Sequence, residues 1–136
     1  MELTLALLAD YANISREGKL NIMGIFEQIF ALNFPAVHAQ LQLVLRLEST
    51  PFESGTHPLR VAFIDADAHE LFAIPGSLNI PDSQSGENIT TNQIFLLNGV
   101  TLPRPGVYEF VIHINEQEVG RVPLRAIAVS PPGAEK

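Results

Sequence analysis

The residues best suited to chemistry in this chain stand together in one short segment, Asp65-Ala66-Asp67-Ala68-His69-Glu70. Asp65 and Asp67 alternate, so an extended backbone would project both carboxylates to the same side. Carboxylates grouped at a loop are what a hard cation such as calcium requires. Asp65, Asp67 and His69 are therefore the candidate metal ligands of the sequence.

The same segment has a second interpretation, a solvated acidic turn between two strands. Aspartate and histidine are common turn residues and need no metal there. Calcium takes about six to eight oxygen ligands, more than this segment supplies. Glu53, Asp82 and Glu87 would have to converge on it from other loops.

Familiar catalytic and cofactor motifs are absent from the chain. It contains neither the phosphate-cradling GxxxxGK[ST] loop nor GxGxxG. Ser77 follows Gly76, but Asn79 replaces the glycine of a nucleophile elbow. His69-Glu70 begins like a zinc-protease helix, yet Ala73 stands where the second histidine belongs. We therefore expect a non-enzymatic protein with no catalytic residue and no cofactor.

Length and composition predict one domain with its own core, at residues 1–129, followed by a flexible C-terminal tail at 130–136. The chain has 136 residues, 46% of them hydrophobic, and no cysteine, so packing must supply its stability. The net charge is -7 and the eight Lys and Arg residues are scattered, which argues against nucleic acid and anionic membranes as partners.

The apolar N-terminal segment Leu3–Ala9 predicts a first strand rather than a signal peptide, because no basic residue precedes it. No apolar stretch approaches the roughly 20 residues that span a bilayer. We expect a soluble, cytoplasmic protein.

Apolar and polar residues alternate along much of the chain, which is typical of half-buried strands. The clearest cases are Leu41–Glu48, with leucine at every second position, and Tyr108–Ile114. Weaker segments of this kind are Thr4–Ala12, Leu20–Phe26, Gln28–Phe34, Leu59–Asp65, Glu70–Ile80, Ile89–Leu97 and Val122–Val129. With about nine strands and no helical stripe, we predict an all-β antiparallel sandwich, either a jelly roll or an Ig-like or C2-like fold.

Two prolines bear on the topology, because proline cannot donate a hydrogen bond to a ladder. Pro123 predicts an edge or a bulge in the last strand, and Pro75-Gly76 predicts a kink where the chain crosses between sheets. An unprotected edge invites pairing with another chain. We therefore expect a protein partner or a homo-oligomer, joined through an edge strand.

Two segments carry a family resemblance, Gly18–Phe26 (GKLNIMGIF) and Pro105–Phe110 (PGVYEF). Together with the residues between them they resemble a family of small uncharacterised bacterial proteins, and the likeness covers nearly the whole chain. The resemblance implies a bacterial β-sandwich and no particular activity. Ala68 stands where a turn glycine is expected, which implies a looser hairpin.

Three classes of function remain open. The first is a non-enzymatic interaction module that acts on a protein partner or on itself. The second is a domain that binds a small ligand, a carbohydrate or calcium, although the chain has no Trp and only two Tyr to stack on a sugar. The third is a metal-dependent enzyme that uses Asp65, Asp67 and His69.

Overall fold

The computed structural model describes residues 1–130, which form nine strands and one short 3-10 helix. They are β1 (Glu2–Ile14), β2 (Leu20–Phe26), β3 (Gln28–Ala31), β4 (Ala36–Ser49), η1 (Pro51–Glu53), β5 (Gly55–Ile64), β6 (Glu70–Ile80), β7 (Ile89–Leu102), β8 (Gly106–Ile114) and β9 (Gln117–Ala128). The predicted all-β class and the strand number are confirmed. Most of the tail predicted at 130–136 lies outside the described residues.

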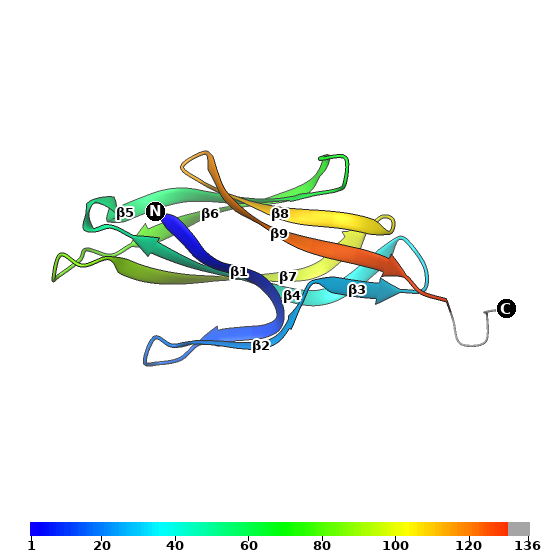
Figure 1. The fold of residues 1–136 in the computed structure, drawn as a ribbon, viewed down its shortest axis with the longest axis horizontal. Helices are drawn as coiled ribbons and strands as arrows, with labels where there is room; N and C mark the ends of the chain where they lie inside the picture. Colours follow the sequence, from blue (N-terminus) through cyan, green and yellow to red (C-terminus); the bar gives the residue numbers. More distant parts are fainter. Residues whose placement is uncertain (131–136) are drawn as a thin grey trace.

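The strands form two sheets, which appear as two layers in Figure 1. The four-stranded sheet has the order β2-β1-β4-β7, and the five-stranded sheet has the order β3-β9-β8-β5-β6. The chain passes between the sheets at Glu27, and β3 then lies parallel to β9. No helix among the described residues is long and apolar enough to cross a membrane.

The core lies between the two sheets and comes from the alternating residues that the sequence marks. One sheet contributes the fully buried leucines of β4, and the other contributes a cluster of aromatic rings. The ring of Phe63 packs 4.5 Å from that of Phe110 and 5.4 Å from that of Tyr108, measured between centroids. A buried side chain of this size contributes about 1.5–3 kcal/mol.

The predicted kink at Pro75-Gly76 is wrong. Strand β6 continues through these residues and stays paired with β5, Arg60 opposite Pro75 and Leu59 opposite Gly76. Proline is tolerated because β6 is the last strand of its sheet and one of its sides carries no ladder. Pro123 also lies at a local edge, since β3 pairs with β9 only from Arg125 onward.

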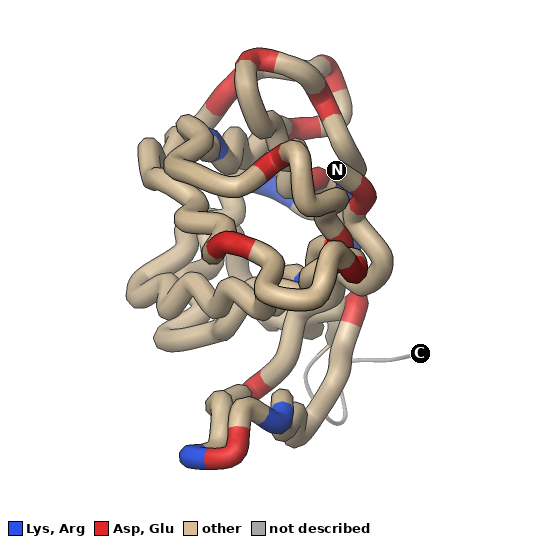
Figure 2. The backbone as a smooth tube through the Cα atoms, turned by 90° about the vertical axis from the view of Figure 1, so that its left-hand side faces the viewer, with Lys and Arg blue, Asp and Glu red and all other residues tan. Residues whose placement is uncertain are grey.

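Beyond Ala9, the hairpin formed by β1 and β2 extends away from the rest of the sheet, and we call this part the arm. Strand β1 pairs with β4 only as far as Ala9, and beyond it β1 pairs with β2 alone. There the backbone N–H of Ala12 donates to the side-chain oxygen of Gln42 at 2.6 Å, which replaces a ladder bond. The arm extends from the body with charged residues at its tip (Figure 2).

Candidate functional site

The segment with the densest chemistry forms the turn between β5 and β6, as the alternating pattern predicts. The N–H of Asp65 donates to the carbonyl of His69, and the N–H of Ala68 donates to the carbonyl of Asp65, both at 3.0 Å. Ala68 adopts a left-handed conformation with φ 64°, which costs a residue with a Cβ about 1–2 kcal/mol. The hairpin is therefore closed, and alanine takes the conformation expected of a glycine.

The carboxylate of Asp65 holds this turn together. Its Oδ1 accepts the backbone N–H groups of Asp67 and His69, each at 2.9 Å. The N–H of His69, then that of Asp67, together with the neighbouring His69 ring and the guanidinium of Arg104, hold the pKa of Asp65 below its ordinary value. Asp65 is thus an ionised anchor of the turn.

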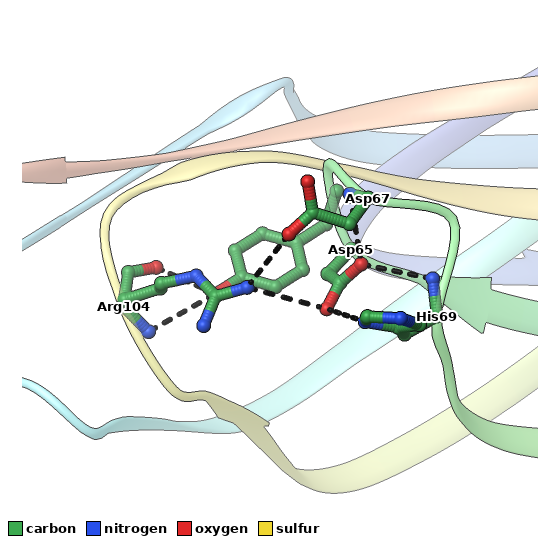
Figure 3. Close-up of polar contacts among 5 residues, drawn as sticks. Asp65, Asp67, His69 and Arg104 are labelled. Atoms are coloured by element: carbon green, nitrogen blue, oxygen red, sulfur yellow. Dashed lines mark hydrogen bonds and ion pairs between the residues drawn. The ribbon is translucent and has the colours of Figure 1, made fainter.

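A basic residue from another part of the chain faces the two aspartates (Figure 3). Arg104 lies in the connection between β7 and β8, and its Nη2 is 3.3 Å from Asp67 Oδ2 and 3.5 Å from Asp65 Oδ2. His69 Nδ1 lies 3.6 Å from Asp65 Oδ2. Sequence reasoning missed Arg104, because 37 residues separate it from Asp67 and no local pattern links them.

Tyr108 fixes the backbone of Arg104. Its hydroxyl donates to the carbonyl of Arg104 at 2.5 Å and accepts the N–H of the same residue at 3.1 Å. Tyr108 is 2% exposed, so its ring is buried while its hydroxyl keeps both hydrogen bonds. Tyr11, the other tyrosine of the chain, lies on the arm without an opposing layer and is 52% exposed.

The three metal-ligand candidates do come together in space. One ligand atom from each of Asp65, Asp67 and His69 lies within 4.8 Å of the others. Among the described residues, Glu53, Asp82 and Glu87 do not join this group. Its oxygens already accept backbone N–H groups or face the guanidinium of Arg104.

A groove of about 430 Å³ lies beside β5, β6 and β8 in the five-stranded sheet. It is lined by Pro58, Leu59, Arg60, Pro75, Gly76, His113 and Glu116. His113 is half-buried, and its Nδ1 is buried without a hydrogen-bond partner among the described residues. No sequence pattern marked this groove, because its lining comes from separate strands.

A further candidate is the outer edge of the four-stranded sheet. Strand β7 pairs with β4 from Ile89 opposite Ser49 to Leu102 opposite Ala36, with one interruption at Gly99, whose φ is 66°. On its other side it has no neighbouring strand, and within residues 1–130 no other backbone hydrogen bond reaches it. The sequence predicts an edge that pairs with another chain, but it does not show which strand provides it.

The fold and these sites define an all-β protein. Among the described residues, its one cluster of metal-type ligands is already bonded to the local backbone and to Arg104. The chain belongs to a family of unknown function, DUF6941, whose model matches residues 4–127. No curated protein matches it.

Among solved structures, the chain is similar to the Pseudomonas fluorescens alkylpurine DNA glycosylase AlkC bound to DNA containing an abasic site analog. The identity is 14% and the TM-score is 0.45. The match covers 90% of this chain but only 30% of the glycosylase chain, and it is too distant to bear on function.

Proposed function

We propose that this protein is a non-enzymatic cytoplasmic interaction module, which binds a protein partner or a second copy of itself by adding a strand to the free edge of β7. The observation that carries the proposal is the edge of this 14-residue strand, regular over Ile89–Asn98 before the left-handed Gly99, with its outward N–H and C=O groups unpaired. Strand addition supplies main-chain hydrogen bonds as the source of affinity.

The β7 edge lacks the features by which proteins protect an exposed strand. Residues Ile89–Leu102 include no charged residue and no proline. The other edge strands are each protected in some way. Strand β6 contains Glu70 and Pro75, and β3 has only four residues. A left-handed glycine interrupts both remaining edges, but Gly24 leaves only Leu20–Met23 of β2 regular, whereas Gly99 leaves Ile89–Asn98 of β7. Of the edges, β7 is therefore the best suited to receive another strand.

Apolar side chains at the border between the sheets also support binding at β7. Several side chains that pack against the core there are only partly buried, namely Phe72 and Ile74 of β6 and Ile89, Phe95 and Leu97 of β7. The two strands approach each other at Gly76, where a Cβ would lie 3.9 Å from the ring of Phe95. A strand added beside β7 would cover part of this apolar surface, which favours its binding.

The strand order favours an Ig-like sandwich over a jelly roll or a C2-like fold. In the Ig fold a tyrosine near the start of the sixth main strand bonds the backbone a few residues upstream. Tyr108, near the start of β8, makes this bond to Arg104. Ig-like folds place a further strand beside the one that corresponds to β7, but here residues 81–88 form no strand. The proposed site is the position of that strand.

A second candidate function is the binding of a small ligand in the groove beside His113, favoured by its buried Nδ1 without a partner. The lining includes no Phe, Tyr or Trp on which a sugar could stack, which argues against a carbohydrate. Calcium binding and metal-dependent catalysis at Asp65, Asp67 and His69 are less favoured. The guanidinium of Arg104 already provides positive charge there.

Native mass spectrometry of the protein purified gently from its host tests the proposal. We expect the wild type to carry a second copy or a partner, and the Leu96→Lys variant to be a bare monomer. Leu96 lies on β7 and is 51% exposed, so lysine fits without disturbing the core. Met23→Lys, on the opposite edge of the sheet and 70% exposed, is the matched control and should keep the complex. A wild type that is a bare monomer would contradict the proposal.

A further inference from the structure

We infer that the strand added at β7 is β7 of a second copy, running antiparallel across a twofold axis. This inference rests on the proposed function and names its partner. The edge described above is the only surface that the inference requires, since both copies would use the same residues.

Charge is the first argument for a second copy. Each chain carries a net charge of -7, so most surfaces of one copy repel the same surface of another. Like charges placed directly opposite each other destabilise a strand pair. Because β7 has no charged residue, two copies can align there without such pairs.

The polar side chains of β7 are complementary to themselves. They are threonine, asparagine and glutamine, which carry hydroxyl or amide groups that both donate and accept hydrogen bonds. A residue of this kind can therefore face its own copy and still form a bond. A strand rich in lysine or glutamate could not do so.

The alternation of side chains along β7 also allows a symmetric pairing on both faces of the sheet. With the twofold axis perpendicular to the sheet and passing within Ile89–Asn98, residues of equal parity in this stretch lie opposite each other, so each face meets its own kind. Outer-face residues such as Ile94 and Leu96 would face outer-face residues of the second copy, and Phe95 and Leu97 would face core-side residues. The combined sheet would have the order β2-β1-β4-β7 continued by the same four strands in reverse.

The arm offers the main competing surface for a second copy. Tyr11, Met23 and Ile25 are exposed there. However, the left-handed Gly24 interrupts the pairing of β2 with β1 and leaves Leu20–Met23 as the longest regular stretch of β2. The left-handed Gly99 interrupts β7 in the same way, but it leaves Ile89–Asn98 regular. The regular edge available on β2 is therefore much shorter than that on β7.

Spin labels provide the test, since the natural chain has no cysteine. Single cysteines would replace the exposed residues Thr90, Leu96 and Asn98 on β7, and Met23 as the control on the opposite edge. The measurement is the distance between each label and its copy, by dipolar electron paramagnetic resonance. In an antiparallel pair, moving a label by one residue changes this distance by twice the strand rise, about 7 Å.

The expected result is a set of distances on β7 that falls toward one point of the strand and rises beyond it, with the Met23 labels further apart than the nearest β7 pair. A shorter distance at Met23, or distances on β7 that do not change with position, would overturn the inference. So would the absence of dipolar coupling together with a complex that contains a different protein and is lost in Leu96→Lys. In that last case the proposed function would stand, whereas a bare wild-type monomer would overturn both.

Discussion

The β5–β6 turn and the β7 edge present two opposite kinds of polar surface. The turn concentrates charge at Asp65, Asp67 and His69, yet these groups bond to one another, to the local backbone or to Arg104. The edge has no charge at all, but a long row of its backbone groups has no protein partner among the described residues. Unsatisfied bonding capacity, rather than density of charge, therefore marks the better candidate for binding.

This comparison predicts that stability and association can be changed separately. Changes in the turn and its supporting corner should alter the stability of the folded chain and leave association unchanged. Changes on β7 should alter association and leave the stability of the monomer nearly unchanged. A variant that moved both quantities together would show that the two regions are coupled.

Tyr108→Phe should have the largest effect on stability. It removes the hydroxyl that bonds both the N–H and the carbonyl of Arg104, and these groups then lose their partner in a partly buried corner. We expect the free energy of unfolding to fall by about 2 kcal/mol. Denaturant unfolding measures this change, and native mass spectrometry should show unchanged association.

Tyr11→Phe is the matched control for that substitution. Tyr11 is exposed, and its hydroxyl is 3.4 Å from the side-chain nitrogen of Asn13, a long contact in solvent. Removing this hydroxyl should hardly change stability. Equal losses from the two variants would show that the corner at Tyr108 contributes nothing particular.

The sequence predicts the strands well and the site only in part, for a physical reason. Alternation reports which residues face a core, so β2 and β6 are predicted with their observed bounds. It does not report which strands become neighbours. The contact of Arg104 with Asp67 and the free edge of β7 both follow from strand order, which depends on contacts between distant segments.

Asp65→Ala should lower the melting temperature by several degrees, whereas Asp67→Ala should change it little. Asp65 accepts two backbone hydrogen bonds that close the turn, and alanine cannot accept them. Among the described residues, the side chain of Asp67 forms a hydrogen bond and an ion pair with Arg104 alone, and exposed ion pairs contribute little. Thermal melts of both variants beside the wild type measure the difference, and equal effects would contradict the anchoring role of Asp65.

The difference between wild type and Asp65→Ala should also depend on pH. The pKa of Asp65 is lowered in the folded state, so in acid the unfolded chain takes up this proton first. The stabilisation is therefore complete above the unfolded pKa of about 4 and is lost as the pH falls through the lower folded value. Melting temperatures of the two proteins should converge as the pH falls below the lowered folded pKa of Asp65, and a gap that persists in strong acid would contradict this account.

The salt dependence of the dimer affinity tests the association at β7. Two copies with a net charge of -7 each repel at long range, and salt screens that repulsion. Raising the salt from about 20 to about 200 mM should therefore tighten the dimer by roughly threefold. Analytical ultracentrifugation measures this affinity. A weaker dimer at high salt would instead indicate opposite charges in contact, and would favour the arm, whose tip carries Arg16 and Lys19.

Calcium should give the smallest effect, and it tests whether Arg104 stands where a cation would bind. Millimolar calcium should leave the melting temperature of the wild type unchanged. In Arg104→Ala the carboxylates of Asp65 and Asp67 lose their guanidinium, and calcium should then raise the melting temperature by roughly one degree. Arg104→Lys retains a positive charge and is the control that should not respond. If the wild type itself responded, the turn would have free bonding capacity after all, and its difference from the β7 edge would disappear.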